Sequence, residues 1–284
     1  MHRKPGKGGS MKTTQNKNRL VLFFACTFLL SWIVWLPGLL HAWGVIQLAH
    51  AGQTLVQIGA YAPTIIALLL VRSTSEAKSA GAQQGEVKDL LRRAVETNFS
   101  LKWYLFAILL APMLMGIAYL LTNLTTGLTL QLEIIKKPFL LFIYLPYILF
   151  LGGPLGEELG WRGFALPRLL VKVRPISAAV VLGIIWSVWH LPQFFMEGTV
   201  QSLIPFYGYA VVTVYNSVFI TILFLATGGS VFPAILYHLF SNFSYSLFPV
   251  FQTRTGQVWI LVVFTAAAAG IILGFRKLLF SKST

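Results

Sequence analysis

Eight long apolar segments, separated by short polar stretches, constrain this chain more than any other feature of its sequence. They cover about 20–40, 54–71, 103–122, 139–167, 176–196, 206–226, 230–248 and 258–275. A helix needs roughly 20 apolar residues to cross a bilayer. Charged residues make up only 11% of the chain, whereas soluble domains carry about 25%. The sequence therefore predicts an all-α integral membrane protein with about eight transmembrane helices.

The Lys and Arg residues predict how these helices are oriented. With the N-terminus inside, the cytoplasmic segments hold nineteen of the 22 Lys and Arg residues, and the external loops hold three. Because cytoplasmic loops are enriched in Lys and Arg, both termini are expected in the cytoplasm. The net charge of +14 is spread between apolar segments rather than over one compact surface. This distribution speaks against a nucleic acid partner and makes the lipid bilayer the expected partner.

The chain is predicted to hold one membrane domain. Residues 1–19 are basic and contain Gly and Ser, so we expect them to be disordered, and residues 20–280 form a single polytopic domain. The segment 86–99 has apolar residues at helical spacing between charges, which is typical of an amphipathic helix on the membrane surface. Cys26 is the one cysteine, which excludes an intramolecular disulfide.

Two adjacent carboxylates, Glu157 and Glu158, stand inside the fourth apolar segment. An ionisable residue within a span costs several kcal/mol and by default indicates a functional site. Two histidines, His190 and His238, also fall inside spans, and Asn242 follows His238 by one helical turn. At 1.5 Å per residue, these groups lie about 12–21 Å from the cytoplasmic edge. We therefore expect them to share one layer and to line a polar cavity within the membrane.

Spacing separates the roles of the two carboxylates. Arg162 follows Glu158 by four residues, so the two can form an ion pair that supports the helix. Glu157 is rotated by about 100° from Glu158 around the helix axis, so it does not share the ion pair and is the candidate catalytic carboxylate. Because the polar groups lie nearer the inner edge, the cavity is expected to open to the cytoplasm. The "GGP" sequence at 152–154 and Pro192 are expected to break helices around it, with Pro192 helping to close the outer side.

These residues resemble the three motifs of the CPBP family of intramembrane proteases, which includes type II CAAX prenyl endopeptidases and bacteriocin-processing or immunity (Abi) proteins. The first motif is E-E-x-x-x-R, from Glu157 to Arg162. The second is an aromatic residue, three residues and a histidine, here Trp186 to His190. The third runs from His238 to Asn242. The resemblance covers about 100–250, the expected protease core. Trp186 stands where phenylalanine is usual in the family, and we expect this departure to affect packing alone.

The resemblance implies a peptide hydrolase that works inside the membrane. It assigns water activation to Glu157 and His190, and oxyanion stabilisation to His238 and Asn242. Three further residues are expected to support the site: Glu158, Arg162 and Trp186. The implied substrate is a membrane-associated peptide or a lipidated protein. The compact loops and the lack of an organelle address favour a prokaryotic plasma membrane.

Metal use and two rival functions stay open at this point. Glu157, His190 and His238 form a His₂Glu set that suits catalytic zinc. However, no H-E-x-x-H motif is present, and water activated without a metal needs the same residues, so metal-free activation is slightly preferred. A non-catalytic membrane scaffold or bacteriocin-immunity protein would keep the fold, but the complete motif set counts against lost chemistry. A proton-coupled transporter is disfavoured because the chain has no repeated halves.

Overall fold

The computed structural model describes residues 8–48, 51–72, 80–127 and 136–281. Within these ranges every regular element is helical, as the composition predicts. In the first half of the chain these are α1 Gly8–Ala42, α2 Ala51–Gly59, α3 Ala62–Arg72, α4 Ala80–Ala94, α5 Leu101–Thr126, η1 Pro138–Leu140 and α7 Leu141–Leu151. The centre holds α8 Pro154–Glu158, η2 Leu159–Ala165, α9 Leu166–Leu170, α10 Pro175–Trp189, η3 Leu191–Phe195 and η4 Gln201–Leu203. The remainder is α11 Phe206–Ala226, α12 Phe232–Leu247, η5 Pro249–Gln252, α13 Arg254–Gly274 and α14 Arg276–Leu279.

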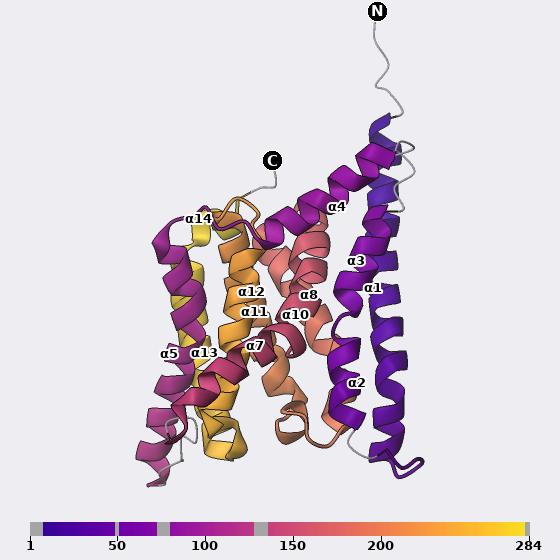
Figure 1. Cartoon of the computed structure of the whole chain (residues 1–284). Helices are drawn as coiled ribbons and strands as arrows, with labels where there is room; N and C mark the ends of the chain where they lie inside the picture. The colour runs from indigo at the N-terminus through magenta and orange to yellow at the C-terminus, as the bar shows by residue number, and fades with distance from the viewer. Residues whose placement is uncertain (1–7, 49–50, 73–79, 128–135, 282–284) are drawn as a thin grey trace, which may run out of the picture.

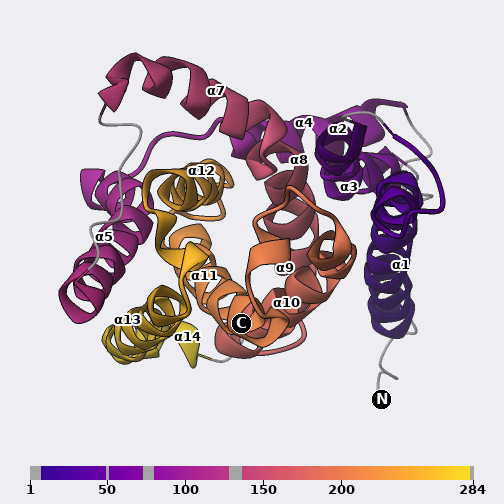
Figure 2. The ribbon, with the colours of Figure 1, turned by 90° about the horizontal axis from the view of Figure 1, so that it is seen from below.

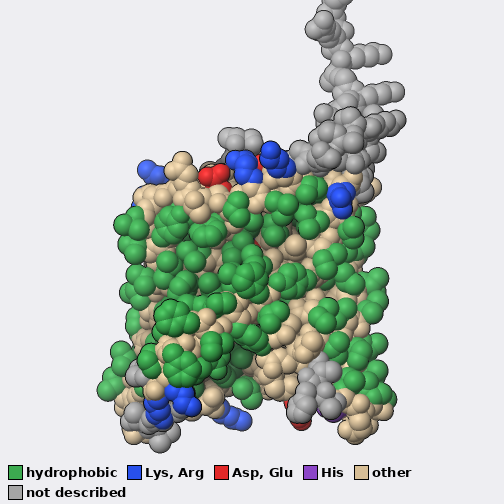
Figure 3. All heavy atoms as spheres, viewed as in Figure 1, with side chains coloured by type: hydrophobic (Ala, Val, Ile, Leu, Met, Phe, Trp, Pro, Cys, Tyr) green, Lys and Arg blue, Asp and Glu red, His purple; other side chains and the backbone are tan. Residues whose placement is uncertain are grey.

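Seven helical segments in the described part of the chain are long and apolar enough to cross a bilayer. They are Asn18–Ala42, Gly52–Arg72, Leu101–Thr126, Pro138–Leu170, Pro175–Phe195, Phe206–Ala226 and Arg254–Gly274. Hydrophobic side chains dominate the lateral face seen in Figure 3, and the Lys and Arg side chains on that face gather at its two ends. The chain is therefore a multi-pass membrane protein, and one of the eight predicted segments, 230–248, is too short a helix to count as a span by length.

The span predicted at 230–248 accounts for the difference between eight predicted segments and seven. Helix α12 has 16 residues, so it is about 24 Å long at 1.5 Å per residue, shorter than a hydrocarbon layer of about 30 Å. The chain turns immediately before α12 at Gly228 and Gly229, which have φ values of 68° and 89°. Residues with a side chain rarely adopt such positive φ values. Pro249 opens a 3-10 turn soon after the helix ends. Thus α12 is a short inner helix, packed against α5, α7 and α11.

Helix α4 lies across one end of the bundle, at the end from which α1 and α14 extend (Figure 1). It overlaps the amphipathic helix predicted at 86–99 but ends at Ala94, and it is docked rather than free on the surface. Leu90 is only 1% exposed, and Nη2 of Arg93 donates to the carbonyl of Gly163 at 3.1 Å. We call this end of the molecule the α4 face, and the end with the α2 start and residues 196–205 the opposite face (Figure 1).

The N-terminal segment differs from the sequence expectation. Helix α1 begins at Gly8, so most of the segment predicted to be disordered, 1–19, continues the first spanning helix. Residues 1–7 of that segment lie outside the described residues. The helical stretch therefore begins well before the apolar residues that would lie in the bilayer.

Broken helices position the centre of the molecule. The fourth span is interrupted at Gly152 and Gly153, between α7 and α8, as the "GGP" sequence predicts. The fifth changes from α10 to the 3-10 turn η3 around His190, next to Pro192. Viewed from the opposite face, α8, α10, α11 and α12 surround one common centre (Figure 2). Residues at the breaks can therefore converge there, although they are distant in sequence.

Candidate active site

Glu157 lies near the end of α8 and is 3% exposed. Its Oε2 accepts a hydrogen bond from Nε1 of Trp186, on α10, at 2.6 Å. Hydrogen bonds to a carboxylate are shorter and stronger than those between neutral groups. The expectation that Trp186 affects packing alone was therefore wrong, because the indole N–H that phenylalanine lacks is bonded to the central carboxylate.

Gly153 makes room for the other oxygen of Glu157. Its φ of 106° lies where residues with a Cβ are strained. A Cβ placed on Gly153 would also collide with Oε1 of Glu157. The backbone N–H of Glu157 in turn donates to the carbonyl of Gly153 at 2.8 Å. The glycine at the helix break thus lets the carboxylate lie directly against the backbone.

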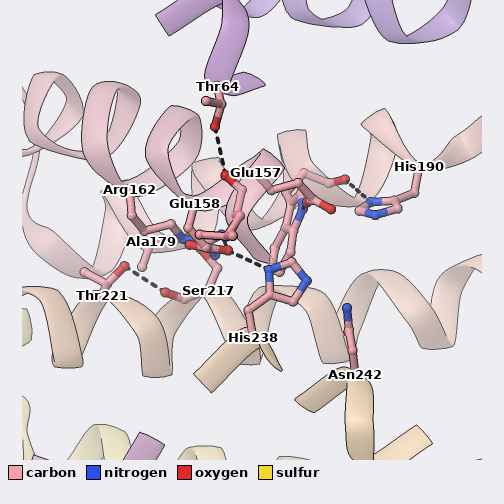
Figure 4. Close-up of polar contacts among 12 residues, drawn as sticks. Thr64, Glu157, Glu158, Arg162, Ala179, His190, Ser217, Thr221, His238 and Asn242 are labelled. Carbon is pink, nitrogen blue, oxygen red and sulfur yellow. Dashed lines mark hydrogen bonds and ion pairs between the residues drawn. The ribbon is translucent and has the colours of Figure 1, made fainter. Parts of the chain in front are cut away.

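One carboxylate oxygen of Glu158 accepts hydrogen bonds from two side chains, Arg162 and His238. Its Oε1 accepts from Nη1 of Arg162 at 2.8 Å and from Nδ1 of His238 at 2.8 Å (Figure 4). The side chains of Glu158 and Arg162 are both 0% exposed. The ion pair expected from their spacing is present, and it also fixes His238, which the sequence did not indicate. Removing either charge would leave the other buried and uncompensated, which is costly.

The residues after Glu158 form a π-helix, η2. Such turns are rare and are frequent at functional sites. Two glycines allow close approach here, because a Cβ on Gly160 would lie 2.5 Å from Pro63 and one on Gly163 would lie 2.6 Å from Leu90. Three large side chains of η2 are fully buried: Trp161, Arg162 and Phe164. They fill the interior between the carboxylates and the α4 face.

His190 follows the last residue of α10 and is 6% exposed. Its Nδ1 lies 2.8 Å from the carbonyl oxygen of Trp186 (Figure 4). Because a carbonyl oxygen can only accept, Nδ1 carries the proton and Nε2 of a neutral ring is left as an acceptor. One tautomer of His190 is thereby favoured, with its basic nitrogen available to a water molecule.

Asn242 and His238 lie one turn apart on α12, and both line the same cavity. The Nδ2 of Asn242 donates one of its two N–H groups to the carbonyl of Gly152 at 2.8 Å. This bond ties α12 to the break between α7 and α8. The second ring nitrogen of His238 lies on the side toward Asn242 (Figure 4).

One cavity of about 280 Å³ joins these groups. All four residues to which the resemblance assigns catalysis line it: Glu157, His190, His238 and Asn242. Sequence reasoning missed the polar wall that α11 contributes, formed by Tyr209, Thr213 and Asn216. Their i, i+4, i+7 spacing marks one face of a helix, so a search for polar stripes within spans would have found them. The Tyr209 ring lies 5.4 Å from that of His190.

The cavity extends toward the opposite face. Its lining includes Gln53 near the start of α2, Glu197 in the loop after η3, and Ser246 near the end of α12, all of them exposed. On the other side, Trp161 and Phe164 of η2 are fully buried, and neither lines the cavity. The described chain ends lie at the α4 face (Figure 1). Cytoplasmic termini and a cavity open to the cytoplasm would require the chain ends and the cavity mouth on the same face. The structure places them on opposite faces, so these two sequence predictions cannot both hold.

The three possible zinc ligands, Glu157, His190 and His238, line one cavity. Among the residues that the structure describes, no three His, Cys, Asp or Glu side chains form a group that could hold a metal ion. The Nδ1 atoms of His190 and His238 are bonded to a carbonyl and to Glu158, an orientation that histidine ligands of metal ions also show. One oxygen of Glu157 is bonded to Trp186.

Comparison with known proteins agrees with this geometry. Residues 137–244 match the model of a family described as type II CAAX prenyl endopeptidase, Rce1-like. This range contains all three motifs. Over 282 residues the chain is 27% identical to a CAAX prenyl protease 2 of Methanococcus maripaludis, an alignment that covers 92% of this chain and 96% of that protein. The chain is therefore similar to Rce1-like type II CAAX prenyl endopeptidases in its central part and to one CAAX prenyl protease over most of its length, and this similarity supports an intramembrane endopeptidase.

Proposed function

We propose that this chain hydrolyses a peptide bond close to the lipid-modified end of a prenylated protein, inside the membrane. The observation that carries the proposal is the cavity that brings Glu157, His190, His238 and Asn242 together among spanning helices. The name of the similar protease supports a prenylated substrate. The compact loops support a place in the cell membrane of a prokaryote.

Water activation falls to Glu157 and His190. A water molecule between them can donate one hydrogen to the carboxylate and the other to Nε2 of His190, because both are acceptors. Its lone pair then points away from both groups and attacks the substrate carbonyl carbon. The water proton passes to Glu157 as the C–O bond forms, which is general base catalysis.

His238 and Asn242 stabilise the resulting oxyanion. The free N–H of the Asn242 amide donates directly, and His238 donates from Nε2 when its ring is protonated. The carboxylate of Glu158 at Nδ1 provides the negative charge that accompanies such a ring. Each donor to an oxyanion contributes about 3–4 kcal/mol in known enzymes. The C–N bond then breaks, and Glu157 passes its proton to the leaving nitrogen, so the carboxylate is regenerated.

Cleavage of a prenylated peptide by the purified protein tests this proposal. The wild type and the double variant Glu157→Gln, His190→Ala would be reconstituted in lipid nanodiscs, with products identified by mass spectrometry. We expect the wild type to yield two fragments whose summed mass exceeds that of the substrate by one water. The double variant, shown to be folded by its thermal transition, should yield none. An intact substrate with both proteins would instead support the non-catalytic scaffold.

A further inference from the structure

A second cavity, of about 390 Å³, lies beside the first, between the beginnings of α11 and α13. Its inner wall is apolar and buried, with Val212, Phe251 and Ile260 each less than 10% exposed. Its rim includes Tyr207 and Val258, which are 70% and 58% exposed. Ligand sites of this size, mostly apolar with few polar groups, are typical of small-molecule pockets. The cavity is therefore suited to an apolar group that enters from outside.

The second cavity adjoins the catalytic one. Ile204, Tyr209 and Tyr245 line both cavities. The Tyr209 ring makes an edge contact with His190, and the Tyr245 ring makes one with Phe251, at a centroid distance of 6.2 Å. These shared side chains place the two cavities next to each other. A ligand with a polar part and an apolar part could therefore occupy both at once.

The wall of the second cavity is held in place by side-chain bonds. Nε2 of Gln257 donates to the carbonyl of Leu203 at 3.1 Å and to that of Phe251 at 2.8 Å. Thr253 caps α13 by accepting from the N–H of Gly256 at 3.0 Å. These bonds connect the segments before α11 and before α13. The cavity is thus formed in advance of binding, which lowers the entropic cost of taking up a flexible chain.

The position of the second cavity matches an apolar chain that comes from the bilayer. It lies where two spanning segments begin, at Phe206 and Arg254, and therefore at the edge of the apolar layer on the opposite face. Arg254 at its rim is exposed, as expected for a basic residue at a membrane interface. A chain anchored in the leaflet on this side could enter without crossing the polar surface.

We propose that the second cavity receives the isoprenoid chain of the substrate while the neighbouring peptide lies in the catalytic cavity. This inference rests on the proposed function and adds the site that binds and recognises the lipid group of the substrate. The isoprenoid thioether is bound through apolar surface removed from water and lipid, with Tyr209 and Tyr245 between the chain and the reacting bond. A lipid acyl chain is the competing occupant, and it would give no preference for prenylated peptides.

Filling the cavity at its rim tests this assignment. Val258→Trp places a large ring in the cavity, while Val262→Trp, one turn along α13, is the matched control because Val262 is 48% exposed and lines neither cavity. Rates would be measured with one peptide carrying either an S-farnesyl or an S-methyl group. Because loss of a single methylene contact changes specificity about 10–200-fold, Val258→Trp should lower kcat/KM for the farnesyl peptide at least about tenfold. It should leave the methyl peptide unchanged, and Val262→Trp should alter neither.

A second variant guards against local misfolding. A Cβ on Gly208 would lie 3.8 Å from Leu261, so Gly208→Leu adds volume in space that is free. It should reproduce the selective loss. If the wild type cleaves neither peptide, the proposed function fails. If the wild type cleaves both equally, or if the cavity-filling variants lower both rates alike or neither, the protease stands and the isoprenoid site is wrong.

Discussion

The indole nitrogen of Trp186 lies 2.6 Å from Oε2 of Glu157, and the guanidinium carbon of Arg162 lies 4.3 Å from the centre of the Trp186 ring. One side chain thus contacts both the carboxylate proposed as the base and the cation paired with Glu158. The hydrogen bond holds one oxygen of Glu157 and leaves the other beside Gly153. The cation over the aromatic face adds a favourable contact in a buried site. The orientation of the base therefore depends on a residue that takes no proton itself.

Trp186→Phe tests this dependence. The change removes the N–H and keeps most of the ring, so the carboxylate loses its orienting donor. Hydrogen bonds to charged groups contribute about 1.5–3 kcal/mol, which corresponds to a decrease in kcat of about 10–150-fold with KM nearly unchanged. Trp259→Phe is the control, because its indole bonds Thr125 at 3.0 Å, away from the cavity. A variant with the wild-type kcat would show that this donor is dispensable.

Gly153→Ala should slow catalysis by displacing the Glu157 carboxylate. The new methyl group would meet Oε1 of Glu157, and a positive φ adds backbone strain. Displacement of a reacting group by about 1 Å can cost roughly 10²-fold in rate, so a loss of that size is expected in steady-state cleavage. The matched change Gly270→Ala, where a Cβ meets nothing within 4 Å, should leave the rate unaltered. Equal rates for the two variants would contradict the close fit at Gly153.

Glu158 and Arg162 are expected to act mainly on stability. Glu158→Ala and Arg162→Ala each leave one buried charge without its partner, which costs about 3–5 kcal/mol. The free energy of unfolding, measured by denaturant titration in detergent micelles, should fall by that amount. The double change Glu158→Leu, Arg162→Met removes both charges and should be less destabilising than either single change. Stability of both single variants at the wild-type level would argue against the structural role.

The sequence sufficed for residues whose role depends on spacing along one helix. The i, i+4 separation of Glu158 and Arg162 predicted an ion pair that the structure contains. Helix rise alone placed His190, His238 and Asn242 in one layer, and these residues line one cavity. Such predictions need only the geometry of a regular helix, and this holds through most of the spans.

Contacts between helices could not be predicted in this way. The bond from Trp186 to Glu157 depends on the rotation of α10 against α8, which no single-helix pattern determines. The predicted direction of the cavity opening was wrong for a related reason. Depth along a helix does not reveal which side is filled, and here Trp161 and Phe164 fill the side toward the α4 face. The π-helix η2 that buries them likewise depends on close contacts between helices, at Gly160 and Gly163.

The cavity mouth and the C-terminal end should be accessible from opposite sides of the membrane. In a Cys26→Ser background, Ser246→Cys lies at the cavity and Lys277→Cys lies at the α4 face, and both native residues are exposed. A membrane-impermeant thiol reagent applied to sealed vesicles of known orientation should label one cysteine from each side. With the cytoplasmic termini that the Lys and Arg distribution predicts, Ser246→Cys reacts from outside. Labelling of both from the same side would overturn the direction assigned to the cavity.

The central claim is that Glu157 is the base that activates water, and the single-turnover rate of Glu157→Gln tests it most directly. Glutamine keeps the shape and can still meet the Trp186 N–H, but it cannot take a proton from water. General base catalysis contributes about 10²–10⁴-fold, so cleavage of a prenylated peptide should slow by at least about 10²-fold, with an unchanged thermal transition. Glu86→Gln, at an exposed carboxylate, should cleave at the wild-type rate. Cleavage by Glu157→Gln at the wild-type rate would contradict the account.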